Sequence, residues 1–150
     1  MNNNKIYPVT EYTMFFDGCS KSNPGEAGIG AVVYNSSLEE IIVVSKAIGV
    51  KTNNESEYMA LIEGLRSLLF RSIKNVIVFG DSQLVINQVT KIYKVKSENL
   101  LPLYNQVQEL LKQFDYIEFK HVLRNKNKRA DELANIGLKN KYICETDIDN

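Results

Sequence analysis

The 150-residue chain contains one histidine and two cysteines, few for a disulfide-rich or zinc-binding protein. Cys19 and Cys144 are too few for a disulfide framework, and a structural zinc site takes about four cysteine or histidine ligands. His121 is the only histidine that could serve such a site. If the chain binds a metal ion, the ligands that remain are carboxylates, which favour hard divalent cations.

The sequence also lacks a long apolar run and an excess of charge. No stretch approaches the roughly 20 apolar residues of a membrane-spanning helix, and the N-terminus has no apolar signal segment. Eighteen basic and eighteen acidic residues give no net charge, which argues against coating nucleic acid through bulk electrostatics. We therefore expect a cytoplasmic protein without membrane contact, or one of a nuclear or viral replication compartment if the source is eukaryotic or viral.

Length and composition predict one domain over residues 12–139, with a flexible N-terminal tail at 1–11 and an acidic C-terminal tail at 140–150. Alternating apolar runs predict strands, and apolar residues at helical spacing predict helices. The predicted order is β-β-β-α-β-α-α-β-α, which indicates an α/β fold with a five-stranded mixed sheet and helices on both faces. The strands are expected at 12–16, 27–34, 41–48, 76–79 and 116–122, and the helices from 54, from 81 or 82, at 97–114 and at 128–138.

Four acidic residues stand in well-formed local motifs, and each also has a purely structural explanation. Asp17 precedes a glycine as in a turn, and Glu57 could complete a capping box with Asn54. Asp81 could be the N-cap of the helix that follows it, and Asp131 lies where a first helical turn favours negative charge.

Considered together, the four acids predict a metal site. The crossover between the early strands and strand 76–79 makes that strand a parallel neighbour of strand 12–16, so Asp17 and Asp81 would emerge side by side. That edge is where open α/β sheets bind ligands, and Glu57 and Asp131 could complete the cluster. Four close carboxylates repel one another unless cations neutralise them, which two Mg²⁺ ions would do.

With their neighbours, these acids resemble ribonuclease H of type I, and the resemblance extends from Tyr12 to Leu138. Each motif alone is modest evidence, but four in this order and spacing are specific. The matching motifs are Asp17-Gly18, Ser22-Asn23-Pro24-Gly25, Gly28-Ile29-Gly30, Thr52-Asn53-Asn54 with Glu57, Asp81-Ser82-Gln83-Leu84-Val85, and the run from His121 to Ala134 that contains Arg124, Asn127, Ala130, Asp131 and Leu133.

The resemblance implies an endoribonuclease that hydrolyses the RNA strand of an RNA/DNA hybrid and leaves 5′-phosphate and 3′-hydroxyl ends. It implies that Asp17 bridges two metal ions and that Glu57, Asp81 and Asp131 supply the other ligands. These four acids are the expected catalytic and metal-binding residues. The expected cofactor is two Mg²⁺ ions, with Mn²⁺ as a possible substitute, and the expected protein is a monomer. One metal ion would activate the attacking water and the other would stabilise the departing 3′ oxygen.

Choice of the RNA strand requires contacts to its 2′-hydroxyls, which lie in the wide minor groove of an A-like duplex. The resemblance assigns these contacts to Asn23, Asn53, Asn54 and Gln83. An amide side chain can both donate to and accept from a hydroxyl. Helix capping is the alternative explanation for Asn53 and Asn54.

Two features depart from bacterial members of the family. Counting places His121 where these have a loop histidine that assists product release, but strand alternation places it on strand 116–122, as in the plant and archaeal-like branch. We therefore expect a structural role for His121 and a phosphate contact for Arg124. The basic protrusion is reduced to residues 91–96, whose lysines could equally form a solvated face.

The same residues leave two other functions open, and one other reactive group lies near the predicted site. A nuclease of the same fold could act on branched DNA, although the asparagine and glutamine motifs count against it. A non-catalytic hybrid-binding module would gain nothing from clustered negative charge facing phosphates. Cys19 adjoins the predicted site, but we expect an unreactive thiol, because reactivity requires an electropositive setting.

Overall fold

The computed structural model describes residues 11–140, so the two predicted tails lie almost entirely outside the described residues. Five strands and four helices are present in this part, and no helix within it is long and apolar enough to cross a bilayer. The strands are β1 (Thr13–Ser20), β2 (Gly25–Tyr34), β3 (Glu40–Lys51), β4 (Asn75–Gly80) and β5 (Tyr116–His121). The helices are α1 (Asn53–Phe70), α2 (Gln83–Val89), α3 (Leu101–Leu111) and α4 (Lys128–Lys139), and a 3-10 turn, Arg124–Lys126, precedes α4.

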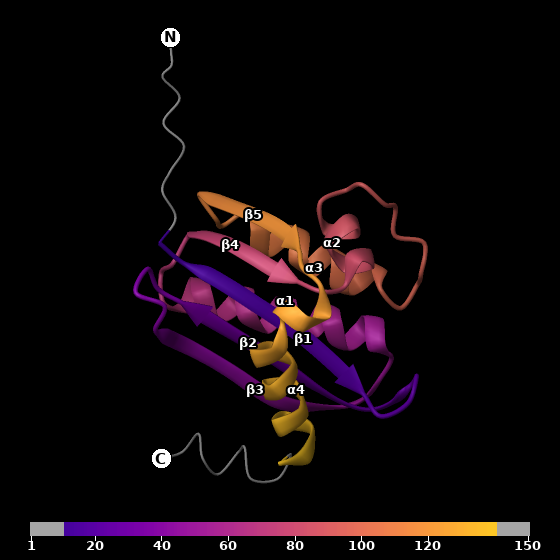
Figure 1. Ribbon diagram of the computed structural model, residues 1–150. Coiled ribbons are helices and arrows are strands. Elements are labelled where there is room, and N and C mark those ends of the chain that lie inside the picture. Colours follow the sequence, from indigo (N-terminus) through magenta and orange to yellow (C-terminus); the bar gives the residue numbers. More distant parts are fainter. Residues whose placement is uncertain (1–10, 141–150) are drawn as a thin grey trace.

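The strands form one mixed sheet in the order β3-β2-β1-β4-β5 (Figure 1). β1, β2 and β3 are antiparallel, whereas β4 runs parallel to both β1 and β5. Thr13 pairs with Ile77 and Phe16 with Gly80, so β4 ends beside Phe16, the residue before Asp17, while β1 continues to Ser20. The five-stranded mixed sheet and the parallel pairing of its central strands were both predicted and are confirmed.

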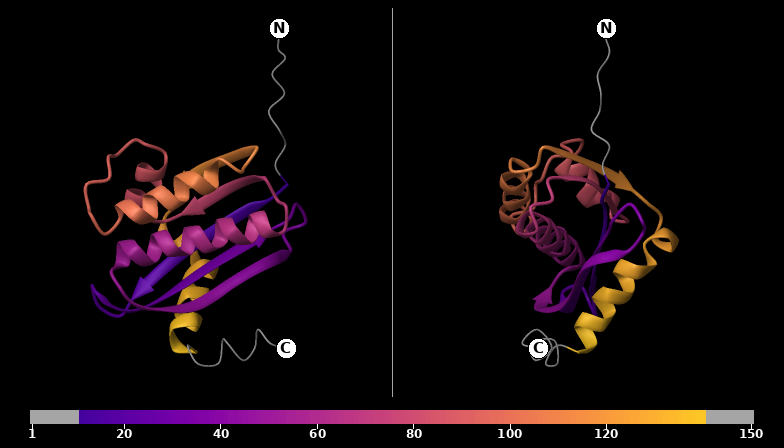
Figure 2. Two further views of the ribbon diagram at one scale, coloured as in Figure 1. Left: turned by 180° about the vertical axis from the view of Figure 1, so that it is seen from behind. Right: turned by 90° about the vertical axis from the view of Figure 1, so that its left-hand side faces the viewer.

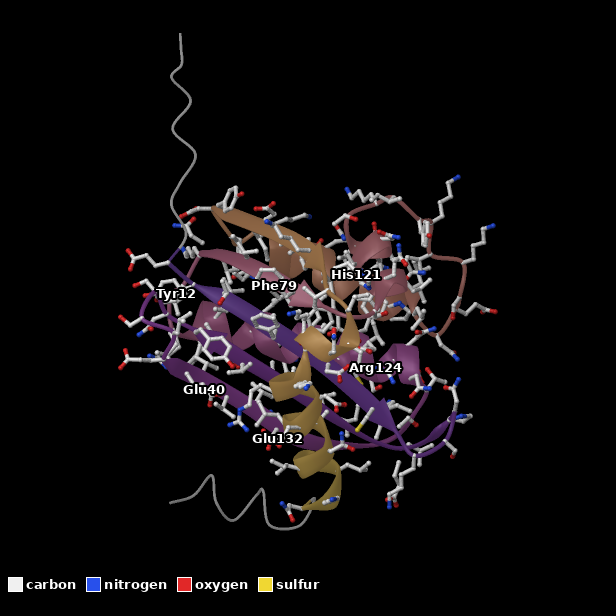
Figure 3. All side chains as sticks on the ribbon, viewed as in Figure 1. Tyr12, Glu40, Phe79, His121, Arg124 and Glu132 are labelled. Atoms are coloured by element: carbon white, nitrogen blue, oxygen red, sulfur yellow. The ribbon has the colours of Figure 1, made fainter. Side chains whose placement is uncertain are left out.

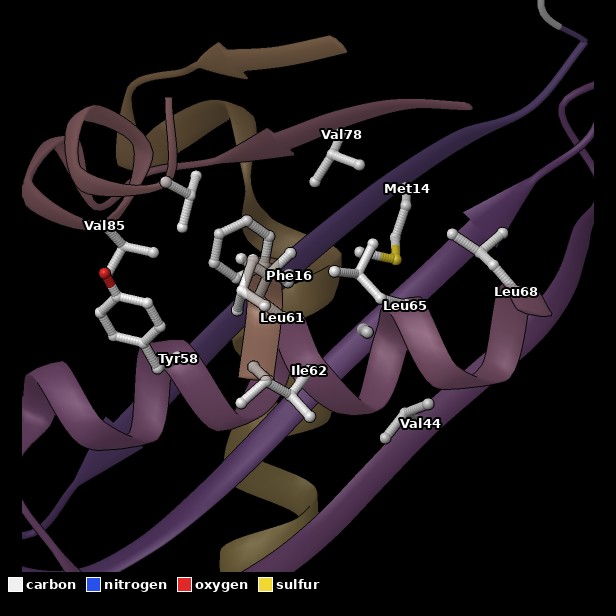
Figure 4. Packing of buried hydrophobic residues seen from close by; sticks show 14 of the residues in the cluster. Met14, Phe16, Val44, Tyr58, Leu61, Ile62, Leu65, Leu68, Val78 and Val85 are labelled. Carbon is white, nitrogen blue, oxygen red and sulfur yellow. The ribbon is translucent and has the colours of Figure 1, made fainter. Parts of the chain in front are cut away.

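Helices cover both faces of the sheet, as predicted (Figure 2). α1 and α3 pack on one face and α4 on the other, across β1, β2 and β3. The predicted apolar stripe of α1 is buried, and Figure 4 shows Leu61 and Leu65 packed between the helix and the side chains of Met14 and Phe16 from β1. Because α1 is fixed to the strand that carries Asp17, its first two turns are held beside that residue.

Glycines allow α4 to lie unusually close to the sheet. A Cβ atom at Gly28 would lie 2.3 Å from the Ala134 carbonyl oxygen, and one at Gly30 would lie 2.3 Å from the Ala130 carbonyl oxygen. The motif Gly28-Ile29-Gly30 therefore permits a close approach between two backbones. Gly30 pairs with Asp17 in the sheet, so this close approach also sets how far α4 lies from the neighbour of Asp17 on β2.

The largest differences from the predicted element boundaries are in β1 and α3. β1 was expected to end in a turn at Asp17-Gly18, which is wrong: the strand continues to Ser20 because β2 pairs with it as far as Ala27, and the turn falls at residues 21–24. The helix expected at 97–114 spans only Leu101–Leu111. Pro102 lies in its first turn, where a missing amide proton costs nothing.

Candidate active site

Three of the four predicted acids converge where β4 ends beside the middle of β1. Asp17 lies in β1, Asp81 directly follows β4, and Glu57 extends from the second turn of α1. A carboxylate oxygen from each of the three lies within 4.8 Å of the others. Asp17 and Glu57 line a cavity of about 320 Å³, and Asp131, from the first turn of α4, lines it as well. The full lining is Asp17, Gly18, Cys19, Ser20, Asn53, Glu57, Arg124 and Asp131.

Glu57 is free to enter the cluster because other residues cap α1. The N-cap is Thr52, whose hydroxyl accepts the Glu55 amide proton at 3.1 Å, while the Glu55 carboxylate accepts the Thr52 amide proton at 2.8 Å. The capping explanation for Glu57 is therefore wrong. Its Oε1 instead accepts the Gly18 amide proton at 3.2 Å, and a Cβ atom at Gly18 would lie 2.3 Å from the Ser56 carbonyl carbon. Gly18 thus serves close approach rather than a turn.

Asp81 is likewise free of the capping role considered for it. Ser82 is the N-cap of α2, and its hydroxyl accepts the Val85 amide proton at 3.2 Å. The Asp81 carboxylate instead accepts a hydrogen bond from Asn127 Nδ2 at 3.1 Å. Asp131 does occupy the first turn of α4, as expected, and its carboxylate accepts from Asn135 Nδ2 at 3.3 Å.

The cluster is electrostatically strained without a cation. Burial, the negative charge of Asp81 and the neighbouring Asp131 together raise the pKa of Asp17 to about 8, although a hydrogen bond with Glu57 lowers it. Burial also raises the pKa of Glu57 well above its usual value, as do the charges of Asp17 and Asp81. Carboxylates that hold protons near neutral pH offer hard oxygen ligands, and a divalent cation can replace those protons. The three converging carboxylates therefore fit a divalent metal ion.

This raised pKa predicts how the stability of the metal-free protein depends on pH. Because the pKa of Asp17 rises from 3.8 to about 8 on folding, the folded protein binds the proton more tightly. The contribution of Asp17 to stability is full below about pH 4 and is lost as the pH rises to about 8. Thermal unfolding in chelator should show the midpoint falling as the pH rises through neutral, and added Mg²⁺ should raise it most at the alkaline end. A midpoint in chelator that rises steadily over this range would contradict the prediction.

The residues predicted to contact sugars fall into two groups. Asn23, Asn53 and Asn54 lie together: Asn23 Oδ1 accepts the Asn53 amide proton at 2.9 Å, and Asn53 lines the acidic cavity. Since Thr52 caps α1, the capping explanation for Asn53 and Asn54 is wrong. Gln83 is exposed at the start of α2 and, within residues 11–140, is not among the residues that line either polar cavity near the acids.

A second polar cavity adjoins the first, and the sequence did not indicate that Ser97 and Asn99 line it. It encloses about 240 Å³ and combines the α1 N-terminus with the loop before α3. Ser97 and Asn99 belong to that loop because α3 begins only at Leu101. Pro102 was the available signal, since proline favours the first helical turn and so places residues 97–99 before the helix. The lining residues are Asn23, Thr52, Asn54, Ser97, Asn99 and Leu100.

The structure places the three remaining candidates near the acids. His121 ends β5, as strand alternation predicted, and its Nε2 lies 3.3 Å from the Asp81 carbonyl oxygen. Arg124 lines the acidic cavity, and Figure 3 shows both side chains where β5 leads into α4. Burial raises the pKa of the Cys19 thiol, as do the charges of Asp17, Asp131 and Glu57, which agrees with the expected unreactive thiol.

Comparison with known proteins agrees with this fold. A family model described as Reverse transcriptase-like matches residues 15–137. The Bifunctional protein Rv2228c of Mycobacterium tuberculosis is 44% identical over 120 residues, which cover 79% of this chain but only 33% of that protein. The chain therefore spans about a third of the length of this relative.

Other relatives match over nearly their whole length. Ribonuclease HI of Haemophilus ducreyi is 36% identical over 146 residues, covering 87% of this chain and 92% of that protein. The crystal structure of LC11-RNase H1 in complex with RNA/DNA hybrid superposes with a TM-score of 0.81 at 34% identity, covering 85% of this chain and 96% of that one. On this sequence and structural evidence, the chain belongs to the type I ribonuclease H family.

Proposed function

We propose that the chain is a metal-dependent endoribonuclease that cleaves the RNA strand of RNA/DNA hybrids and leaves 5′-phosphate and 3′-hydroxyl ends. The observation that carries the proposal is the convergence of Asp17, Glu57 and Asp81 from three separate elements, with carboxylate oxygens within 4.8 Å of one another. Membership of the ribonuclease H family and the hybrid bound by the similar LC11-RNase H1 support the choice of substrate.

The proposed cofactor is a pair of Mg²⁺ ions, for which Mn²⁺ could substitute. Asp17, Glu57, Asp81 and Asp131 would hold them, and Asp17 is the acid that interacts with each of the other three. Bound there, the ions would supply an activated water and charge stabilisation at the departing 3′ oxygen. No nucleophile from the protein is needed for this reaction.

The polar residues around the acids are the proposed substrate contacts. Asn23, Asn53, Asn54 and Gln83 are exposed and present amides that can recognise 2′-hydroxyls. Arg124, in the same cavity as the acids, is the proposed contact to a phosphate. His121 contacts the backbone at Asp81, which favours a role in holding the end of β4. We further propose that the protein acts as a monomer, since one chain carries the whole acid cluster. The proposed compartment is the cytoplasm.

A nuclease acting on branched DNA is the alternative that keeps the fold and the metal site. A non-catalytic hybrid-binding module is the other alternative, but the buried and mutually repelling acids count against it, because clustered negative charge disfavours phosphate binding. These three functions predict different substrates and different responses to a chelator.

The decisive experiment compares cleavage of labelled RNA/DNA hybrid, duplex RNA, duplex DNA and a four-way DNA junction, with Mg²⁺ and with chelator. The proposed function predicts that only the hybrid is cut, only in its RNA strand, and only with the metal. Folded protein that leaves the hybrid intact in Mg²⁺ would exclude the proposal, and preferential cutting of the junction would favour the first alternative.

Asp81→Asn should abolish this cleavage and keep hybrid binding. The amide keeps the shape of the side chain and can still accept a hydrogen bond from Asn127, but it weakens the metal site at the end of β4. Cleavage and equilibrium binding of the same labelled hybrid should be measured together. An Asp81→Asn variant that binds poorly but cuts normally would contradict the assignment.

A further inference from the structure

Asn127 is a buried asparagine at the start of α4 that makes no capping contact there. Asparagine is among the best N-cap residues, because its side-chain oxygen normally accepts an amide proton from the first turn. Asn127 occupies the N-cap position, yet within the described chain its side chain makes no capping hydrogen bond to α4. A capping hydrogen bond typically stabilises a protein by about 1 kcal/mol. Because Asn127 forgoes this bond, its side chain is used for other contacts.

The amide nitrogen of Asn127 instead joins the two central strands of the sheet. Nδ2 donates to the Phe16 carbonyl oxygen at 2.9 Å and to Asp81 Oδ2 at 3.1 Å. Phe16 directly precedes Asp17 in β1, and Asp81 follows β4. Since the Phe16 carbonyl can only accept, the nitrogen must face it, and this fixes which way the amide points.

The same residue also connects to the acid on α4. The Asn127 backbone carbonyl accepts the Asp131 amide proton at 3.1 Å, which is the first hydrogen bond of the helix that carries Asp131. Asn127 therefore donates both to the Asp81 carboxylate and to the carbonyl of the residue before Asp17. Its backbone carbonyl begins the helical turn that positions Asp131.

The remaining atom of the amide argues against a role in stability alone. Asn127 is 1% exposed, and its Oδ1 accepts no hydrogen bond from residues 11–140. A buried polar atom left without a protein partner costs about 1 to 3 kcal/mol. Replacing the asparagine by a smaller residue would avoid that cost. The hydrogen bonds that its Nδ2 donates to Phe16 and Asp81 therefore explain why an asparagine is present.

We propose that Asn127 is a positioning residue for the metal site: its amide holds the Asp81 carboxylate in the orientation in which Asp81 and Asp17 bind a divalent cation together. Hydrogen bonds to ligating carboxylates orient them and raise metal affinity. The inference rests on the proposed function only in taking these acids as metal ligands, and it does not depend on the nucleic-acid substrate.

The test is Mg²⁺ binding to Asn127→Ala, measured by calorimetry on folded, metal-free protein without nucleic acid. We expect the dissociation constant to rise about 10- to 100-fold, as for other residues that orient metal ligands. If the variant also cleaves hybrid, its half-saturating Mg²⁺ concentration should rise while excess metal restores much of the rate. A chain that cleaved nothing would still report Mg²⁺ binding, so the two proposals can fail separately.

Asn135→Ala is the matched control, because Asn135 also donates an amide proton to a site acid, Asp131, but from an exposed position. It should change Mg²⁺ affinity much less than Asn127→Ala. If Asn127→Ala does not fold, Asn127→Ser provides the same test, since one hydroxyl proton cannot serve both acceptors. Mg²⁺ affinity within about twofold of the wild type in a folded Asn127 variant, with only the thermal midpoint lowered, would overturn the inference.

Discussion

Asp17→Asn is expected to lose hybrid cleavage by roughly a thousandfold or more. Metal ions supply several kcal/mol of transition-state stabilisation, and each 1.4 kcal/mol, approximately, is a tenfold change in rate. Asp17 is the most buried acid of the cluster, 5% exposed, and its neighbours Glu57 and Asp81 each bring a carboxylate oxygen within 4.8 Å. Replacing its charged oxygen would therefore remove the proposed common ligand of the two metal ions.

The same substitution should stabilise the metal-free protein. Burial and the charge of Asp81 raise the pKa of Asp17 to about 8, so ionising this carboxyl at alkaline pH costs the folded state free energy. A neutral amide of the same shape removes that cost. The thermal midpoint of Asp17→Asn in chelator should therefore exceed that of the wild type near pH 8, and Mg²⁺ should raise it little.

Single-turnover cleavage and thermal unfolding in chelator check the two expectations on one preparation. Asp115→Asn is a suitable control, because Asp115 is exposed and directly precedes β5, at the end of that strand away from the cluster. It should leave both cleavage and the midpoint unchanged. An Asp17→Asn protein that cuts hybrid at a comparable rate would show that Asp17 is not the shared ligand. A variant less stable than the wild type in chelator near pH 8 would contradict the raised pKa of Asp17.

The sequence predicted the convergence of the acids better than it predicted their local settings. The continuous apolar run at 76–79 indicated a strand buried on both faces, and the crossover rule then placed it parallel to β1. Those two inferences were enough to bring Asp17 and Asp81 together. Both depend on topology, which the order of elements determines.

The local settings were less predictable because neighbouring residues offered competing choices. Thr52 with Glu55 and Asn54 with Glu57 both have capping-box spacing, and the structure selects the first pair. An aspartate followed by glycine is common turn chemistry, but pairing with β2 carries β1 through it. The bond from Asn127 to Phe16 spans 111 residues, so no local pattern indicates it, although the motif contained the residue.

Gly30→Ala has the second large expected effect, on both stability and activity. The added Cβ atom would lie 2.3 Å from the Ala130 carbonyl oxygen and 2.5 Å from the Ala134 backbone nitrogen. These are backbone atoms of α4 and cannot rotate away, so the helix must move off the sheet. Forcing extra atoms into a packed interior costs about 1 to 3 kcal/mol. For a chain of this size, that corresponds to a fall of roughly 2 to 12 °C in the thermal midpoint.

Cleavage should fall further than stability alone explains, because the displaced helix carries Asp131 into the cavity opposite Asp17. A displacement of about 1 Å at a catalytic group can cost roughly a hundredfold in rate. Activity should therefore be measured well below the midpoint of the variant, where the protein is folded, and compared with Mg²⁺ affinity.

Gly49→Ala provides the comparison that separates crowding from the loss of a glycine as such. Gly49 lies in β3 with φ at +82°, and a Cβ atom there would meet nothing within 4 Å. Its replacement should cost about 1 kcal/mol through backbone conformation and leave cleavage unchanged. If Gly30→Ala and Gly49→Ala lost the same stability and both kept full activity, the close packing of α4 would not be what holds Asp131 in the site.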